Sequence, residues 1–218
     1  MPKSKSFISP AEALIPPRPS LASLKNAAAD CQACDLWKKG TQTVFGEGAR
    51  NASLMLIGEQ PGDKEDAAGR PFVGPAGKIL EEALAKAGIA RSEVYVTNAV
   101  KHFSWEPDER GKRRIHKKPR SSEVQACRPW LDAEIQALHP KVIVCMGSTA
   151  AQALLGKQFS VLRRRGVPVP SNLAPFVMAT VHPSSILRAR EDRREQMQAF
   201  IGDLAVAAKQ IHKVAKAA

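Results

Sequence analysis

The chain has 218 residues and a formal net charge of +12, from 33 Lys and Arg against 21 Asp and Glu. This length suits a single compact domain, and a hydrophobic content of 44% is enough for a core, which excludes wholesale disorder. No apolar run approaches the roughly 18–20 residues that span a bilayer. The positive charge suggests a polyanionic partner, with nucleic acid the first candidate and an anionic membrane surface the second.

The first twenty residues do not resemble a secretory signal. They contain Lys3, Lys5 and five prolines, and they lack the apolar stretch of about 7–15 residues that such a signal has. We expect residues 1–20 to form a flexible N-terminal tail and residues 21–218 to form a single domain. The expected compartment is the cytoplasm, where four cysteines are more often metal ligands than disulfides.

Apolar runs alternate with helical patterns along the rest of the chain. Ser20 is a candidate cap for a helix over 21–39, and the run at 53–58 predicts a buried strand that ends in a sharp turn. The further predicted elements, in chain order, are a helix over 75–87, a strand over 93–97, a long basic loop over 101–120, a helix over 122–138 with Ser122 and Gln125 as a capping box, a strand over 141–146, a helix over 148–155, a strand over 176–181 and a helix over 191–213.

This order of elements predicts an α/β fold. Four apolar strands separated by helices are typical of a three-layer sandwich, in which helices cover both faces of a central, mainly parallel four-stranded sheet. Ligands of such folds bind beyond the carboxyl ends of the strands. Three polar segments leave strands at that edge, namely the turn at 59–63, Asn98 and the segment 182–184.

The cysteines are candidate metal ligands. Cys31 and Cys34 form a C-x-x-C pair that can bind a metal from a single turn, and the fold would have to bring in Cys127 and Cys145. A zinc ribbon normally has two close pairs, whereas four separated thiolates also suit a [4Fe–4S] cluster. Three interpretations stay open at this point: an iron–sulfur cluster, a zinc ion, or small buried core residues.

Several motifs together resemble those of the family 4 uracil-DNA glycosylases. The chain carries GEQPG at 58–62, GRPFVGPAG at 69–77, VTNAVKH at 96–102, HPSS at 182–185 and the four spaced cysteines. These features cover residues 29–213, nearly the whole chain. The sequence KRRIH at 112–116 is most similar to the UdgX-type subgroup, and Gln60 stands where ordinary members of the family have alanine.

The resemblance implies an enzyme of base-excision DNA repair that removes uracil after flipping it into a pocket, and that carries a [4Fe–4S] cluster on the four cysteines. Phe72 would stack on uracil, Asn98 would donate to O4 and accept from N3–H, and His182 would face O2 and stabilise the negative charge of the leaving base. The expected substrate-binding residues are Gly58, Gln60, Asp63, Phe72, Asn98, Arg114 and His182, and the expected catalytic residues are Glu59, Gln60, His116 and His182.

The KRRIH histidine has a particular role in the subgroup, where it attacks C1′ and stays bonded to the abasic sugar. A neutral imidazole is a better nucleophile than water, and an alkylated imidazole is a poor leaving group, so such an enzyme would act once. Glu59 would accept the proton that His116 loses, Gln60 would position the imidazole, and Arg114 would anchor the loop or a phosphate.

Each of these residues also has an ordinary structural alternative. Phe72 could be a core side chain, Asn98 a turn residue, His182 a surface residue and Glu59 the solvated acid of a capped turn. His116 lies in a basic run that would bind phosphates without regard to sequence.

Three functions follow from these patterns. The first is a glycosylase captured covalently on its product, the second a turnover glycosylase in which water attacks C1′, and the third a non-catalytic nucleic-acid-binding protein with a structural metal. The expected partner is uracil-containing DNA, single-stranded in the first place and double-stranded as an alternative, with uracil as the product. We expect a monomer and no membrane partner.

Overall fold

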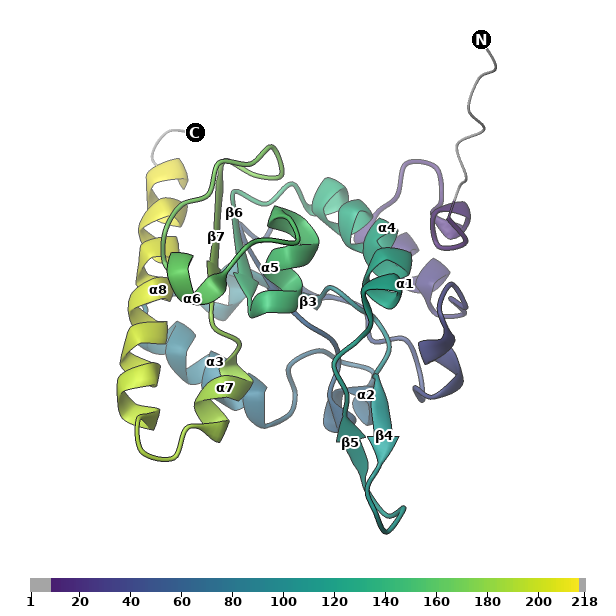
Figure 1. Ribbon diagram of the computed structural model, residues 1–218. Helices are drawn as coiled ribbons and strands as arrows, with labels where there is room; N and C mark the ends of the chain where they lie inside the picture. The colour runs from purple at the N-terminus through teal and green to yellow at the C-terminus, as the bar shows by residue number, and fades with distance from the viewer. Residues whose placement is uncertain (1–8, 216–218) are drawn as a thin grey trace.

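The computed structural model describes residues 9–215. Its centre is a five-stranded mixed sheet in the order β1-β3-β2-β6-β7, in which β1 runs antiparallel to β3 and the other neighbours run parallel (Figure 1). The predicted α/β class and the four parallel strands are confirmed. The strands are β1 (Glu47–Gly48), β2 (Leu54–Gly58), β3 (Val94–Asn98), β6 (Val142–Met146) and β7 (Phe176–Thr180).

Helices cover both faces of this sheet, as predicted (Figure 1). The first apolar cluster joins one face to α3, α7 and α8, and the second joins the other face to α4, α5 and α6. Successive residues of β2 alternate between the clusters, with Leu54 and Leu56 in the first and Met55 and Ile57 in the second. The helices are α1 (Leu21–Ala28), α2 (Asp63–Ala68), α3 (Pro75–Lys86), α4 (Ser121–Leu138), α5 (Ser148–Leu155), α6 (Val161–Arg164), α7 (Pro183–Arg188) and α8 (Arg193–Ala215), with 3-10 turns η1 (Glu12–Leu14), η2 (Asp35–Lys38) and η3 (Arg91–Glu93).

A third cluster lies under the N-terminal part of the chain, between α1 and α4. Ala11 is fully buried in it and Ile15 packs against it, so part of the predicted flexible tail is anchored on the protein; its first eight residues lie outside the described residues. The predicted helix over 21–39 is too long: α1 ends at Ala28, and the C-x-x-C pair occupies the turn between α1 and η2. That turn brings the Cys31 side chain into the third cluster.

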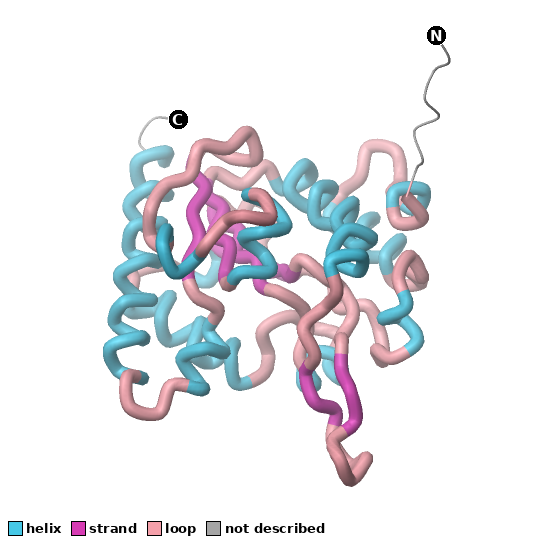
Figure 2. Tube along the Cα trace, viewed as in Figure 1, coloured by secondary structure: helices cyan, strands magenta, loops and turns pink. Residues whose placement is uncertain are grey.

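The basic segment predicted to be a loop forms a two-stranded hairpin instead, with β4 (Trp105–Pro107) paired to β5 (Arg114–His116). Figure 2 shows it projecting from the body of the molecule. Both strands are largely exposed, so no alternation of apolar and polar residues marks them in the sequence. The prediction also missed β1, which is too short for such a pattern, and it placed the cap of α4 wrongly, because the Glu123 carboxylate accepts from Arg120 N–H.

A buried ion pair connects the sheet to α4. Lys101 follows β3 and is 1% exposed, and its ammonium pairs with the fully buried carboxylate of Glu134 on α4. The carboxylate also accepts from the Tyr95 hydroxyl at 2.8 Å and the Thr97 hydroxyl at 3.0 Å, while Lys101 Nζ donates to the Asn98 carbonyl at 2.8 Å. Both charges are therefore surrounded by hydrogen-bonding partners, as buried charges require.

In the part of the chain that the structure describes, no helix is both long and apolar enough to cross a membrane.

Replacing one member of the Lys101–Glu134 pair should destabilise the fold. In Lys101→Met the Glu134 carboxylate stays buried without its counter-charge, so we expect a loss of about 3–5 kcal/mol in the free energy of unfolding by urea. Lys86→Met is the matched control, because it breaks an exposed ion pair to Glu82 and should cost less than about 1 kcal/mol. A Lys101→Met protein as stable as the control would contradict this account.

Candidate active site

The turns that follow β2 and β3 are held together by their backbones. Ala99 N–H donates to the Gly58 carbonyl at 2.9 Å, and Val100 N–H donates to the Glu59 carbonyl at 3.0 Å. The predicted GEQPG turn and the predicted Asn98 therefore meet at the carboxyl edge of the sheet, where ligands of α/β folds bind.

Three predicted substrate-binding side chains converge on Gly58. A Cβ atom built on this glycine would lie 2.4 Å from Asn98 Oδ1, 2.7 Å from Phe72 Cζ and 3.3 Å from His182 Nε2. The Phe72 and His182 rings have centroids 6.1 Å apart and planes inclined by 30°. Glycine at position 58 therefore lets two rings and one amide converge on its backbone, and the space between these side chains is the candidate ligand site.

Asn98 presents a buried hydrogen-bond acceptor to this space. The residue is 2% exposed, and its Oδ1 has no hydrogen-bond partner among the described residues. Buried polar atoms in folded proteins are normally paired, so an unpaired one between two aromatic rings points to a ligand that donates a hydrogen bond. Its backbone is fixed from behind by Lys101 Nζ.

His182 presents a hydrogen-bond donor to the same space. Its Nδ1 accepts from Ser184 N–H at 3.2 Å. A backbone N–H can only donate, so Nδ1 is unprotonated and the neutral ring carries its hydrogen on Nε2, the atom nearest to Gly58. Burial, together with the nearby His116 and Arg188, lowers the pKa of His182 to about 4. At neutral pH the ring is therefore an uncharged donor.

Phe72 is held in place by its own loop. Its φ of 56° lies in the left-handed region, which is unfavourable for a residue with a side chain. Gly77 on α3 makes room for this backbone, since a Cβ there would lie 1.7 Å from the Phe72 carbonyl oxygen. Glu65, which no motif in the sequence marks, joins this loop to the GEQPG turn: its carboxylate accepts from Gly74 N–H at 2.7 Å and from Gly62 N–H at 3.2 Å.

His116 and Glu59 face each other at the base of the hairpin. His116 ends β5, its side chain is 51% exposed, and its Nε2 lies 3.4 Å from Glu59 Oε1. The other carboxylate oxygen of Glu59 accepts from the hydroxyl of Thr149 on α5. Thr149 therefore orients the carboxylate, and no feature of the sequence marks it for that role.

Gln60 fixes the segment that carries His116, but through the backbone. Its Nε2 donates to the carbonyls of Ser104 at 3.1 Å and Lys117 at 3.0 Å, and its Oε1 accepts from Ser104 N–H at 3.0 Å. In this structure the Gln60 amide is occupied by the residues that flank β4 and β5, so it positions His116 through the backbone and makes no bond to the imidazole.

Arg114 and Asp63 bind each other. Arg114 Nε donates to Asp63 Oδ1 at 2.7 Å, and Nη1 donates to the buried Asp66 at 2.5 Å. The guanidinium also lies over the rings of Phe103 and Trp105, 5.4 and 5.7 Å from their centroids. Of the two roles expected for Arg114, the structure shows it as the anchor of the hairpin on α2, and it gives Asp63 the same structural role.

Three of the four cysteines share the third cluster. Trp130 Nε1–H donates to Cys31 Sγ at 3.2 Å, Lys101 N–H donates to Cys127 Sγ at 3.2 Å, and Cys34 packs against the same cluster. Burial raises the pKa of Cys127 to about 12, with a further contribution from the other two thiols.

Cys145 lies elsewhere. It occupies β6 between Ile57 and Ala179 of the neighbouring strands, within the second cluster, and burial raises its pKa to about 12. Among residues 9–215, no group of three or more His, Cys, Asp or Glu is arranged to hold a metal ion. The predicted set of four cysteine ligands does not fit one [4Fe–4S] cluster in this structure.

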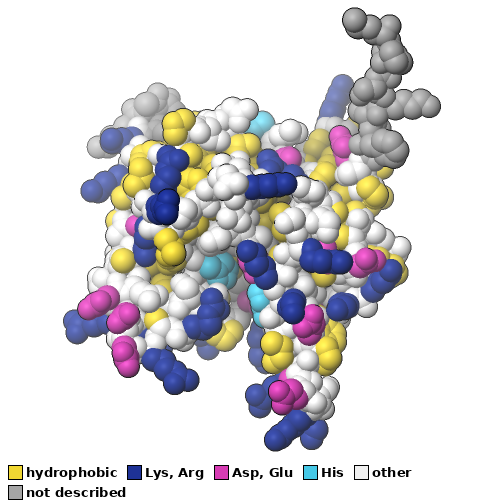
Figure 3. All heavy atoms as spheres, viewed as in Figure 1, with side chains coloured by type: hydrophobic (Ala, Val, Ile, Leu, Met, Phe, Trp, Pro, Cys, Tyr) yellow, Lys and Arg dark blue, Asp and Glu magenta, His cyan; other side chains and the backbone are white. Residues whose placement is uncertain are grey.

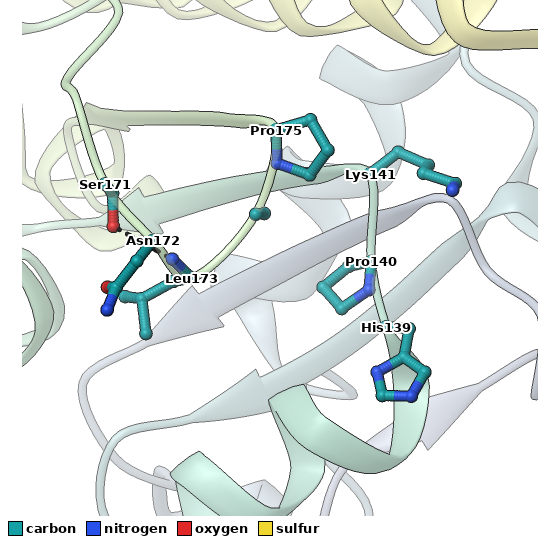
Figure 4. Close-up of a pocket in the computed structure, with 8 residues that line it drawn as sticks. His139, Pro140, Lys141, Ser171, Asn172, Leu173 and Pro175 are labelled. Carbon is teal, nitrogen blue, oxygen red and sulfur yellow. Dashed lines mark hydrogen bonds between the residues drawn. The ribbon is translucent and has the colours of Figure 1, made fainter.

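The hollow in Figure 4 is separate from this site. It is lined by residues such as Lys141 and Pro175, which precede β6 and β7 and therefore lie at the amino ends of these strands. The candidate ligand site beside Gly58, and His116, lie at the opposite edge of the sheet.

The buried His182 should make stability depend on pH. Its pKa is about 4 in the folded protein against an ordinary value of 6.5, so the unfolded chain binds the proton more readily between these values. The contribution of neutral His182 is complete above pH 6.5 and is lost as the pH falls through 4. In His182→Asn the asparagine can still accept from Ser184 N–H but does not titrate. We therefore expect its free energy of unfolding by urea to fall less than that of the wild type between pH 6.5 and pH 4.

The exposed His139, at φ 50°, gives the control His139→Asn, since asparagine tolerates this backbone conformation. Its stability should follow the wild-type pH profile. A wild-type and a His182→Asn profile that run parallel between pH 7 and 4 would contradict the assignment of a buried neutral ring.

Known proteins share this sequence pattern. A sequence model of the uracil-DNA glycosylase superfamily matches residues 45–205. The chain is 39% identical to a type-4 uracil-DNA glycosylase of Thermotoga maritima, over 74% of this chain and 80% of that protein. It is 35% identical to a type-4 uracil-DNA glycosylase of Archaeoglobus fulgidus, over 85% and 93%, and 26% identical to a type-5 uracil-DNA glycosylase of Pyrobaculum aerophilum, over 77% of each. The chain belongs to the uracil-DNA glycosylase superfamily.

Proposed function

We propose that the protein excises uracil from DNA and then stays covalently bonded to the abasic sugar through His116. The type-4 relatives carry the name of the first activity. The second rests on one observation: a partly exposed imidazole, on a hairpin that Gln60 and Arg114 hold in place, lies 3.4 Å from the Glu59 carboxylate. The space between Phe72, Asn98 and His182, beside this pair, is called the base pocket below.

Recognition of uracil follows from the pocket. The unpaired Oδ1 of Asn98 accepts from N3–H of uracil, and cytosine lacks a hydrogen at that position. Phe72 offers a ring face for stacking, and His182 Nε2–H donates to an oxygen of the base. DNA brings the base there after it has been flipped out of any stack. Figure 3 shows Lys and Arg side chains around the histidines on this face, where phosphates would lie.

Cleavage breaks the bond between C1′ of the sugar and N1 of uracil. The electron pair of this bond goes to the base, whose negative charge is stabilised by the hydrogen bond from neutral His182. The Glu59 carboxylate stabilises the positive charge that develops on the sugar. An unprotonated imidazole nitrogen of His116 then bonds to C1′, and the proton on its other nitrogen passes to a carboxylate, for which Glu59 is in place.

The product persists for a chemical reason. Reversal by water requires imidazole to leave C1′, and a neutral alkylated imidazole is a poor leaving group. A protonated alkylated imidazole would be a better leaving group, but Glu59 takes up this proton. The same carboxylate that assists the attack of His116 on C1′ therefore also slows the release of the sugar from His116. None of these steps involves the cysteines.

Filling the base pocket should abolish recognition of uracil. Gly58→Ala puts a methyl group within 2.4–3.3 Å of Asn98, Phe72 and His182. We expect at least about a tenfold loss of affinity for a single-stranded oligonucleotide with one 2′-fluoro-2′-deoxyuridine, a uridine whose glycosidic bond resists cleavage. Gly202→Ala on α8 is the control, because a Cβ there meets no atom within 4 Å. Equal affinities of Gly58→Ala and wild type would place the base elsewhere.

Covalent capture should appear as single use. With a molar excess of uracil-containing single-stranded DNA, uracil release should stop at about one equivalent, and denaturing SDS gels should show a heat-resistant protein–DNA band. His116→Ser should lose this band. Lys112→Ala, which removes a positive charge from the same hairpin but no nucleophile, should keep it.

The other hypotheses predict different results. Many equivalents of uracil without a band would indicate that water attacks C1′. A band of equal strength in His116→Ser would place the nucleophile elsewhere. No uracil release, together with equal binding of uracil-free DNA, would indicate a non-catalytic nucleic-acid-binding protein.

A further inference from the structure

A groove between α4 and α5 lies beside the reaction site and has no role in the steps described above. We propose that this α4–α5 groove binds the sugar–phosphate backbone on one side of the flipped uridine, with the phosphate next to Lys118 and Lys157. The groove is lined from α4 by Ser121 and Gln125, from α5 by Thr149 and Gln152, and by these two lysines. The proposal rests on the proposed function, because it takes uridine-containing DNA as the ligand.

The groove is continuous with the reaction site. Thr149 lines it and also donates its hydroxyl hydrogen to the Glu59 carboxylate, so one side chain belongs to both. Lys118 stands two residues beyond His116, on the irregular segment that connects β5 to α4. A polynucleotide whose C1′ lies between His116 and Glu59 would therefore enter the groove with its neighbouring backbone unit.

The charges of the groove suit a phosphate. Lys118 and Lys157 are exposed, and neither has an ion-pair partner among the described residues. Arg128, the third cation of the lining, is already paired with Asp132 at 2.6 Å. No carboxylate belongs to the lining within residues 9–215, so a phosphate meets two free ammonium groups and no acidic side chain.

The remaining lining favours backbone over bases. Its apolar members are the aliphatic Pro119, Val124 and Ala153, which suit the carbons of a sugar, and it contains no aromatic ring of the kind on which unpaired bases stack. The hydroxyl of Ser121 and the amides of Gln125 and Gln152 are donors that suit phosphate and sugar oxygens. The volume is about 280 Å³, which is enough for a sugar and its phosphate and small for a complete nucleotide chain.

The test uses probes of increasing length around one 2′-fluoro-2′-deoxyuridine. The shortest is this nucleoside alone, without phosphates, and others carry one or two thymidine nucleotides, each joined through a phosphate, on the 5′ side or on the 3′ side. Dissociation constants are measured for the wild type and for Lys118→Ala/Lys157→Ala, with Lys141→Ala as the control, since this exposed lysine lines the hollow at the opposite edge of the sheet.

We expect the double variant to lose most of the affinity that extension adds on one side of the uridine, and to keep the gain on the other side. The slope of log K against log salt concentration should fall by about 0.7 for each phosphate that the variant no longer binds. Binding of the shortest probe and of the Lys141→Ala protein should match the wild type.

Two results would overturn the proposal: equal gains from extension in the double variant and the wild type, or an equal loss on both sides, which would indicate a general charge effect. Failure of the proposed function is seen separately, as equal binding of probes with thymidine in place of the uridine. The groove proposal predicts that the preference for uridine over thymidine is the same in the double variant as in the wild type.

Discussion

Lys101 and Glu134 carry opposite charges in a part of the molecule that water does not reach, and the rest of the site is arranged around them. A buried charge is tolerated only when its counter-charge and its hydrogen-bond partners are fixed. Here these partners include the hydroxyl of Thr97 and the carbonyl of Asn98. The exit of β3 is thereby immobilised, and through the backbone bonds to Gly58 and Glu59 so is the turn after β2.

The candidate site thus combines residues held by the central sheet with residues of the β4–β5 hairpin. The proposed base pocket combines the loop residue Phe72 with residues at the ends of buried strands, whereas His116 lies on an exposed hairpin outside the central sheet (Figure 2). Polar contacts from Gln60 and Arg114 hold this hairpin against the sheet edge. Under the proposed function, base recognition and attack on the sugar are carried by different segments, so a change in the hairpin would alter the fate of the product without altering which base is recognised.

The sequence predicted what depends on apolar patterning and on strand ends. The four parallel strands are short apolar runs, and Gly58, Asn98 and His182 meet because parallel strands end at one edge. The hairpin was missed because its strands are exposed on both faces. The Lys101–Glu134 pair was missed because it joins residues 33 positions apart. Cys145 is separated from the other three cysteines because its side chain lies on the face of β6 that packs in the second cluster, and the spacing of the cysteines along the chain does not show this. Arg114 was expected at the ligand because its two acidic partners, on another element, are not evident from the sequence.

The central claim is that His116 forms the bond to the sugar, and peptide mass spectrometry of the protein–DNA product tests it most directly. Digestion with a nuclease and with a protease that cleaves after glutamate releases residues 110–123, in which His116 is the sole histidine. The account predicts that this peptide carries the mass of a deoxyribose remnant and that fragmentation places it on His116. An unmodified peptide, or a remnant on another residue, would contradict it.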